Sequence, residues 1–439
     1  MTAAPAGDKN AAMSTMAAHG TPLESLSLAE GVEVILDLSR LLSRALHPLP
    51  TGIDRVELTY ARQLMALIPD RLSFAGINPF GLYGRFPAEA VARFLDDTEM
   101  RWSNPGAPAR SEMLTSAARS LVRLHPRRVP RATRSVRRYY LQASPHHLDR
   151  PRQVRAKLRA EDARFICLVH DLIPIEYPEY ARPSGADTHS RRIETMAALA
   201  DGLIANSHAT AKSMLRYLDG RRPVPPIRVA HLGCDPLPEP GDAKVDIAGP
   251  YFAVVSTIEP RKNHLLLLNI WRRMLETFGP ARTPHLAIVG RRGWENENII
   301  DMLDRSTAIR GHVHELPRLS DREVSALLRG ARALLCPSFA EGFGMPVTEA
   351  LLGGTPVICS DLPALREAGG DVPDFIDPLD GPAWIKAIMD FSAADGGGGS
   401  EMRSAQLERL RGWAAPGWRA HIETVLGLIA ELDIGRNSR

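Results

Sequence analysis

Cysteine is scarce in this chain, with 4 among 439 residues. Cys167, Cys234, Cys336 and Cys359 stand far apart and form no C-x-x-C pair, so their spacing predicts neither a zinc site nor a disulfide framework. Cys336 and Cys359 lie in apolar runs, where cysteine usually acts as a small buried hydrophobic residue. Such use of cysteine is typical of a reducing compartment, and we expect the protein in the cytoplasm.

Long apolar segments are also missing. No run approaches the ~20 apolar residues that a membrane-spanning helix needs, so we expect contact with a membrane surface at most. Residues 1–30 are rich in Ala, Ser, Thr and Gly, and no basic segment followed by an apolar core marks a secretory signal there. Their composition predicts a disordered tail.

The formal net charge is only +3, which argues against a molecule that binds polyanions over its whole surface. Basic residues are nevertheless concentrated from Arg119 to Arg159, where thirteen Lys or Arg accompany a single acid, Asp149. Tyr and Leu are interleaved with them, so the stretch predicts either contact with an anionic membrane surface or a solvated helical face. No nucleic-acid-binding motif accompanies it, and we expect no nucleic-acid partner.

The remaining pattern predicts two α/β domains. A chain of 439 residues is too long for one ordinary core, and short apolar runs alternate with helix-length amphipathic segments, as in parallel sheets covered by helices. Strands are predicted at 32–38, 165–169, 203–205, 227–230, 251–255, 285–289, 313–316, 333–336, 356–359 and 375–376. Helices are predicted at 55–67, 208–217, 265–277, 298–303, 321–329, 346–352, 363–368 and 382–391. Ser320 and Glu323 are spaced as a capping box at one helix start.

Changes in composition mark the domain boundaries. Residues 235–250 are rich in proline, which interrupts the alternation of strands and helices and predicts an interdomain linker. We therefore place the domains at 31–240 and 241–415. The DGGGGS segment at 395–400 predicts a flexible break, and residues 416–439 contain an amphipathic helix that we expect to pack back on the N-terminal domain.

The segment SFAEGFGMPVTEA, residues 338–350, combines a strand end, two glycines and a helix start. Pro346 is favoured in the first turn of a helix, and the glycines allow a ligand to approach the backbone closely. The free N–H groups of the helix N-terminus predict a diphosphate site. Glu341 precedes the turn, and Glu349 is expected in the first helical turn, where each carboxylate can accept sugar hydroxyls. The alternative is an exposed Glu341 and a Glu349 that interacts only with the helix dipole.

The segment STIEPRKN, residues 256–263, follows the first predicted strand of the second domain. Its adjacent cations, Arg261 and Lys262, are suited to neutralise a diphosphate leaving group. The alternative is a solvated basic turn. The segment HLAIVGR supplies a strand and a turn at Gly290, which packing alone would explain.

Taken in order, these motifs resemble those of the retaining glycosyltransferases of family 4, which have the GT-B fold. The resemblance is strongest over residues 251–390, through TIEPRKN, the two glutamates seven residues apart (E-x7-E) and GTPVICSDLPALREAGGD. It is weaker in TGIDRVELTYA and VHDLIPIEY, and TGIDR has one Gly where many members have two. The resemblance implies two Rossmann-like domains that face a central cleft.

The resemblance assigns roles to residues of the second domain. Arg261 and Lys262 would hold the donor phosphates, and Glu341 would contact hydroxyls of the transferred sugar. Glu349 would bind the nucleotide ribose. The backbone of Phe343 and Gly344 would lie against the sugar and the diphosphate.

The rest of the implied donor site comes from several loops. The base would pack near Leu316–Arg318, mostly through backbone contacts, and Gly290 is expected among the donor-binding residues. From the first domain, His170 would reach across the cleft to the donor sugar, and Asp171 would orient it or act on the acceptor. Gly52 would permit close approach of donor or acceptor. A purely structural role is the alternative for each of these first-domain residues.

The resemblance also implies a reaction. A nucleotide-diphosphate sugar would donate a hexose, with retention at the anomeric carbon, to a saccharide or lipid-linked saccharide. The leaving diphosphate would accept the proton of the incoming hydroxyl. No metal or other cofactor is expected, since no convincing D-x-D motif is present.

The N-terminal motifs narrow the choice of donor. VHDLIP and TGIDRVE resemble bacterial mannosyltransferases that build surface polysaccharide such as lipopolysaccharide, which favours GDP-mannose and leaves rhamnosyl and glucosyl donors open. Two other classes stay open: an epimerase or phosphorylase on the same architecture, and a non-catalytic scaffold that binds nucleotide sugars.

Overall fold

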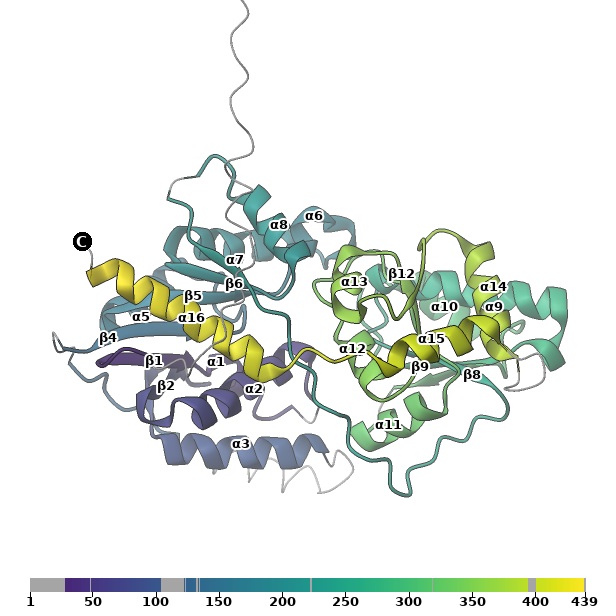
Figure 1. Ribbon diagram of the computed structural model, residues 1–439, viewed down its shortest axis with the longest axis horizontal. Coiled ribbons are helices and arrows are strands. Elements are labelled where there is room, and N and C mark those ends of the chain that lie inside the picture. Colours follow the sequence, from purple (N-terminus) through teal and green to yellow (C-terminus); the bar gives the residue numbers. More distant parts are fainter. Residues whose placement is uncertain are drawn as a thin grey trace, which may run out of the picture.

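The computed structural model describes residues 28–103 and 122–437, except residues 48, 123, 132, 134, 222, 318 and 394–399. The chain forms two α/β lobes that lie side by side (Figure 1). One contains a seven-stranded sheet in the order β3-β2-β1-β4-β5-β6-β7, and the other a six-stranded sheet in the order β10-β9-β8-β11-β12-β13. Each is a doubly wound sheet covered by helices, which confirms the predicted α/β class with two Rossmann-like domains.

The N-terminal sheet has three strands that the sequence pattern did not predict. Its strands are β1 (Val32–Asp37), β2 (Leu72–Ile77), β3 (Tyr83–Phe86), β4 (Arg137–Gln142), β5 (Ala163–Val169), β6 (Gly202–Ala205) and β7 (Ile227–Val229). The pairs of this sheet are parallel except at one edge, where β3 runs antiparallel to β2. Strands β3 and β4 were missed because Arg85 and Arg138 interrupt their apolar pattern. Both arginines are buried and pair with Glu33.

Helices cover both faces of this sheet. They are α1 (Ser39–Ser43), α2 (Gly52–Leu67), α3 (Ala88–Ser103), α5 (Pro151–Glu161), α6 (Ile173–Glu176), α7 (Gly185–Leu199) and α8 (His208–Tyr217). Helix α2 starts at a reciprocal capping box of Thr51 and Asp54, which satisfies free N–H groups of its first turn. Ser207 caps α8 by accepting a hydrogen bond from the backbone of Thr210.

The C-terminal domain contains every strand and helix predicted for it, together with α15, which was not predicted. Its strands are β8 (Tyr251–Val255), β9 (His285–Val289), β10 (Val313–Leu316), β11 (Leu334–Cys336), β12 (Val357–Ser360) and β13 (Asp374–Ile376). Its helices are α9 (His264–Phe278), α10 (Glu297–Arg305), α11 (Asp321–Gly330), α12 (Met345–Leu352), α13 (Pro363–Gly369), α14 (Gly381–Ser392) and α15 (Glu401–Arg411). The capping box of Ser320 and Glu323 is confirmed.

One boundary in this domain differs from the expectation. Helix α12 begins at Met345 with Gly344 as its N-cap, so Glu349 is the fifth helical residue, and the first turn holds no acidic residue. An α-helix turns once in ~3.6 residues, which places Glu349 in the second turn rather than the first. Its carboxylate is therefore set back from the free N–H groups of the helix start.

Two crossing segments connect the lobes. The chain between β7 and β8 has no helix or strand, and the last helix, α16 (Trp418–Asn437), runs back over the N-terminal lobe (Figure 1). The two segments meet where Cys234 N donates to the Pro416 carbonyl at 2.9 Å. At Gly233, a Cβ would lie 2.3 Å from the backbone nitrogen of Trp418, so only glycine permits this close crossing.

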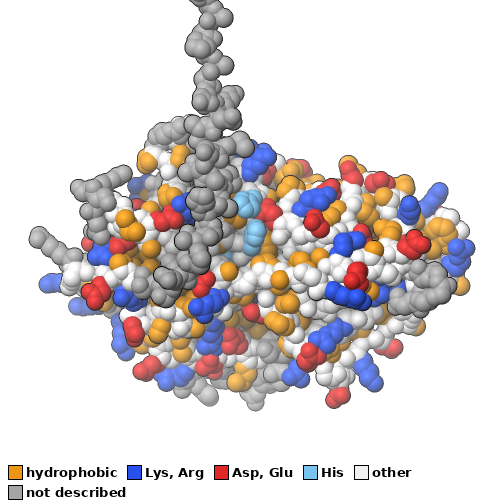
Figure 2. All heavy atoms as spheres, in the orientation of Figure 1, with side chains coloured by type: hydrophobic (Ala, Val, Ile, Leu, Met, Phe, Trp, Pro, Cys, Tyr) orange, Lys and Arg blue, Asp and Glu red, His pale blue; other side chains and the backbone are white. Residues whose placement is uncertain are grey.

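Among the described residues of the basic stretch from Arg119 to Arg159, some cations are paired within the fold or buried, and the first residues of the stretch lie outside the described ranges. Arg137 pairs with Asp433 of α16, and Lys157 is buried against Asp37 at 2.7 Å. On the face in Figure 2, acidic and basic side chains are interspersed. None of the described helices is both long and apolar enough to span a membrane.

Candidate functional site

Parallel pairing brings the predicted cations to Glu341. Strands β8 and β11 are neighbours, so the segments that follow their carboxyl ends meet at one edge of the sheet. Arg261 and Lys262 occupy a 3-10 turn (Pro260–Lys262) after β8, and Glu341 lies in the loop after β11. Lys262 Nζ donates to Glu341 Oε1 at 2.5 Å, and Arg261 Nη1 donates to Oε2 at 2.9 Å.

These contacts keep Glu341 ionised although it is buried. Burial by itself raises the pKa of the carboxyl, but the charges of Lys262 and Arg261, with hydrogen bonds from Lys262 and Ser338, lower it to about 2. Arg261 also donates two hydrogen bonds to Glu259, at 3.0 and 2.7 Å. Two cations thus face two carboxylates, so an incoming anion would compete with Glu341 for Arg261 and Lys262.

Glu349 has the opposite protonation tendency. Burial raises the pKa of its carboxyl to about 7, with the positive charge of Arg55 opposing and the negative charge of Asp321 adding to the rise. Arg55 comes from α2 of the other lobe and pairs with Asp321 at 2.7 Å. A cavity of about 260 Å³ lies here, lined by Arg55, Asp321 and Glu349 together with Met345 and residues 233–238 of the linker.

The loop between Glu341 and Glu349 contains two glycines, which allow it to pack tightly against its surroundings. A Cβ at Gly342 would lie 2.3 Å from the carbonyl oxygen of His170 in the other lobe. Gly344 has φ +120°, and a Cβ there would lie 2.6 Å from Leu365. Phe343 between them is buried with its ring stacked on His231, 5.6 Å between centroids. The loop is therefore held in one conformation against the N-terminal lobe.

His170 and Asp171, which are adjacent in the first domain, differ in their surroundings. His170 Nε2 lies 2.8 Å from the carbonyl oxygen of Ala143 in its own lobe, and burial lowers the pKa of the imidazole. The carboxylate of Asp171 accepts from the backbone of Ile173. Asp171 and Glu341 both line an interdomain cavity of about 380 Å³, with walls from α6, α8 and α13. Asp171 therefore shares a cavity with Glu341, while the imidazole of His170 is engaged within its own lobe.

The remaining candidates lie around this edge. Gly52 is the first residue of α2, and a Cβ there would lie 3.9 Å from the sulfur of Met345 across the lobes. Gly290 has φ +152° and packs so closely on Ser256 that a Cβ would lie 1.9 Å from its carbonyl oxygen. Leu316 ends β10, and its carbonyl accepts from the backbone of Gly290 at 3.4 Å. Arg318, placed near the base by resemblance, lies outside the described residues.

Sequence reasoning missed several residues of this site. Glu259 and Ser338 stand within the quoted motifs, and a charge-balance argument for the Arg261–Lys262 pair would have singled out Glu259. Arg55 and Asp321 are 266 residues apart, so no local pattern indicates their contact. Pairs of this kind become visible only when the two lobes are placed against each other.

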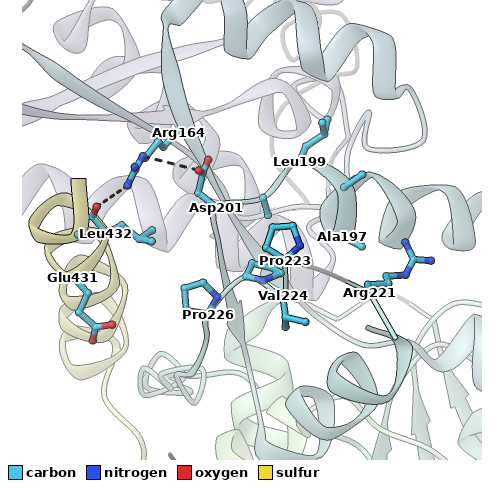
Figure 3. Close-up of a pocket in the computed structure, with 14 residues that line it drawn as sticks. Arg164, Ala197, Leu199, Asp201, Arg221, Pro223, Val224, Pro226, Glu431 and Leu432 are labelled. Atoms are coloured by element: carbon cyan, nitrogen blue, oxygen red, sulfur yellow. Dashed lines mark hydrogen bonds and ion pairs between the residues drawn. The ribbon is translucent and has the colours of Figure 1, made fainter. Parts of the chain in front are cut away.

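A further cavity lies away from all of these residues. It has a volume of about 760 Å³ and lies between the end of α7, the segment before β7 and α16 (Figure 3). Arg164 Nη1 donates to the carbonyl of Leu432 beside it at 2.6 Å. The cavity contains none of the predicted donor-site residues, so its size alone does not connect it with their chemistry.

Comparison with known proteins identifies a family match in the C-terminal half and several relatives. Residues 243–372 match the family model described as Glycosyl transferases group 1, so the C-terminal half carries a domain of that group. The serotype-specific mannosyltransferase WbdA of Escherichia coli is 28% identical over 226 residues, 48% of this chain and 27% of that protein. The O-antigen chain mannosyltransferase B of Escherichia coli is 29% identical over 271 residues, 58% and 66% of the two chains. The matched region thus spans about a quarter of the first relative and just under two thirds of the second.

Solved structures match nearly the whole chain. The α,α-trehalose 6-phosphate synthase of Burkholderia multivorans aligns with a TM-score of 0.58 at 10% identity, over 93% of this chain and 100% of that one. Alr3699/HepE of Anabaena, solved with UDP and glucose, aligns with a TM-score of 0.57 at 14% identity, over 92% and 99% of the two chains. These likenesses confirm the GT-B architecture.

Proposed function

We propose that this chain is a retaining hexosyltransferase of family 4 that takes its sugar from a nucleotide diphosphate. The observation that carries the proposal is the cluster of Arg261, Lys262 and Glu341, with Glu349 on the adjacent helix. Two cations with a buried, ionised carboxylate suit a diphosphate joined to a hydroxyl-rich sugar. A match of residues 243–372 to glycosyl transferases group 1 supports the same reading.

In this mechanism the bond between the anomeric carbon and the diphosphate oxygen breaks, and the acceptor oxygen bonds to the same face of the sugar. Arg261, Lys262 and the N–H groups at the start of α12 stabilise the departing negative charge. The acceptor hydroxyl gives its proton to the leaving phosphate oxygen. Glu341 accepts sugar hydroxyls, Glu349 accepts those of the ribose, and the reaction needs no metal.

Mannose from GDP-mannose is the proposed donor sugar. The proposal rests on relatives named as mannosyltransferases, among them the phosphatidyl-myo-inositol mannosyltransferase of Mycobacterium leprae, 31% identical over 134 residues. The aligned region covers 30% of this chain and 34% of that protein. We propose a saccharide or lipid-linked saccharide as acceptor, used in surface polysaccharide synthesis on the cytoplasmic side of the membrane.

Nucleotide binding tests the proposal directly. The full chain is melted with GDP, UDP, dTDP and ADP and with their common sugars, beside Arg261→Ala and a matched Arg329→Ala control. Arg329 lies in the same domain and pairs with Glu239 at an exposed site, so its loss leaves the cation cluster intact. A ligand at a hundredfold excess over its Kd stabilises the fold by about 2.7 kcal/mol.

We expect GDP and GDP-mannose to raise the melting temperature of the wild type and of Arg329→Ala, but not of Arg261→Ala. This result would support both the proposed donor and its site. If UDP or dTDP sugars raise the melting temperature instead, the proposed transferase activity would stand, but mannose would be wrong as the donor sugar. If no nucleotide stabilises the wild type, the donor site is wrong. Retention is tested by NMR of the anomeric configuration of a mannosylated product, and an inverted product would contradict it.

A further inference from the structure

Glu367 connects the two lobes directly. It lies on α13 of the C-terminal domain, and its carboxylate oxygens accept from the backbone N–H groups of His208, at 2.5 Å, and Ala209, at 2.8 Å. These two residues begin α8 of the N-terminal domain. A carboxylate at a helix N-terminus satisfies free N–H groups and interacts favourably with the helix dipole. Glu367 therefore caps a helix of the opposite lobe; Figure 1 labels the two helices, α13 and α8.

The capped helix end holds the loop that contains Glu341. Ser207, the N-cap of α8, donates from Oγ to the carbonyl of Gly342 at 2.6 Å. Gly342 directly follows Glu341, so the position of α8 sets where this backbone lies. Ser207 therefore links the helix end that Glu367 caps to the loop that contains Glu341.

His231 secures the other side of the loop. Its Nε2 lies 2.9 Å from Glu367 Oε2, and its ring stacks on Phe343 of the loop. His421 of α16 contacts the carbonyl of His231 through Nδ1 at 3.0 Å. In Figure 2, histidine side chains reach the surface near the middle of the molecule, where the lobes meet.

We propose that Glu367 is a positioning residue that fixes the Glu341 loop by capping α8 and holding Ser207 against Gly342. This inference rests on the proposed function for the role of Glu341. It assigns Glu367 no contact with substrate. The residues proposed to bind the nucleotide directly, Arg261, Lys262 and Glu349, lie in the C-terminal domain and do not contact Glu367, so removing the contact should reduce turnover more than nucleotide affinity.

A divalent cation is the competing interpretation of the cluster. His208, His231 and Glu367 place three potential ligand atoms within 4.8 Å of one another. However, both carboxylate oxygens already accept backbone N–H groups, and the positive end of α8 repels a cation. The contacts therefore favour a cap over a metal site.

The test compares Glu367→Gln, Glu367→Asp and a matched Asp361→Asn control in the full chain. Asp361 precedes α13 and pairs with Arg366, the neighbour of Glu367 on that helix, at an exposed site within one lobe. Glutamine keeps the size but loses the charge and places an amide NH2 against the helix N–H groups. We expect Glu367→Gln to lower GDP-mannose turnover about tenfold, because charge-assisted contacts are lost. The Kd for GDP should change less than about twofold, and Glu367→Asp should restore part of the turnover.

Hydrogen exchange at the start of α8 supplies a readout that does not depend on the nucleotide. The amides of His208 and Ala209 should exchange faster in Glu367→Gln and stay protected in Asp361→Asn.

Unchanged turnover and exchange, or a GDP Kd weakened as much as turnover, would overturn the inference. So would a loss of wild-type activity in EDTA that Zn²⁺ restores, which would favour the metal site. If the wild type binds no nucleotide, the proposed function fails, and exchange alone decides whether the cap exists. Should Glu367→Gln not fold, Ser207→Ala against Ser207→Thr tests the same link.

Discussion

Arg55 and Asp321 form two hydrogen bonds, 3.1 and 2.7 Å long, from α2 of one lobe to α11 of the other. Asp321 opens its helix, where a carboxylate also interacts favourably with the helix dipole. Arg55 is close enough to Glu349 for its charge to lower the pKa of that carboxyl. The pair therefore links the placement of the two lobes to the ionisation of the proposed ribose ligand.

Arg55→Gln should raise the pKa of Glu349 further, since it removes the nearby positive charge. The pH at which nucleotide affinity reaches half its maximum should move upward, because the ribose hydroxyls donate to an ionised Glu349. Calorimetric titration of the nucleotide between pH 5.5 and 9 measures this midpoint. Arg62→Gln, on the same helix and paired with Asp96 and Glu99, is the control. An unshifted midpoint in Arg55→Gln would contradict the coupling.

Glu349→Gln should stabilise the protein at alkaline pH. The pKa of Glu349 rises from 4.5 to about 7 on folding, so its favourable contribution is present below pH 4.5 and is lost as pH rises through about 7. Glutamine avoids this loss, and the gain above pH 7 should be on the order of 1–3 kcal/mol. Urea unfolding at pH 5 and pH 8.5 provides the comparison, and an equal difference at both pH values would rule the explanation out.

Glu341→Gln should separate nucleotide binding from transfer. Without the Glu341 carboxylate, Lys262 loses its ion-pair partner and Arg261 keeps only Glu259, so the fold should lose about 3 kcal/mol while GDP binds several-fold more tightly. Turnover of the sugar donor should fall about a hundredfold, because the sugar hydroxyls lose a charged acceptor and keep only the weaker amide oxygen. Glu315→Gln, which alters an exposed pair with Arg292, is the control for charge loss in this domain. Weaker GDP binding in Glu341→Gln would show that the carboxylate does not compete with phosphate.

Gly290→Ala should destabilise the C-terminal domain by more than about 3 kcal/mol. The added Cβ would lie 1.9 Å from the carbonyl oxygen of Ser256, so the backbone of two neighbouring strand ends must move apart. Gly354→Ala is the matched case, because Gly354 has φ +80° and nothing within 4 Å of the added atom. Backbone strain alone should cost it about 1 kcal/mol. If chemical unfolding shows the same loss of unfolding free energy in both variants, close packing at Gly290 does not explain the destabilisation.

Local pattern determined much of the C-terminal domain. Strands β8, β9, β11 and β12 are short apolar runs buried on both faces, so composition alone indicates them, and the capping box of Ser320 and Glu323 marks its helix start directly. The same reasoning placed Arg261, Lys262 and Glu341 at strand ends. Parallel strands bring their carboxyl ends to one edge, which is why these separate motifs predicted a shared site.

Tertiary structure decided the features whose partners are distant in the sequence. Strands β3 and β4 contain Arg85 and Arg138, which no local rule places inside a protein, and distant carboxylates neutralise them there. The contacts of Arg55 with Asp321 and of Glu367 with α8 join residues 266 and 159 positions apart. A sequence pattern records which side chains alternate along one element, whereas the partner that makes a buried charge stable is set only when the elements pack.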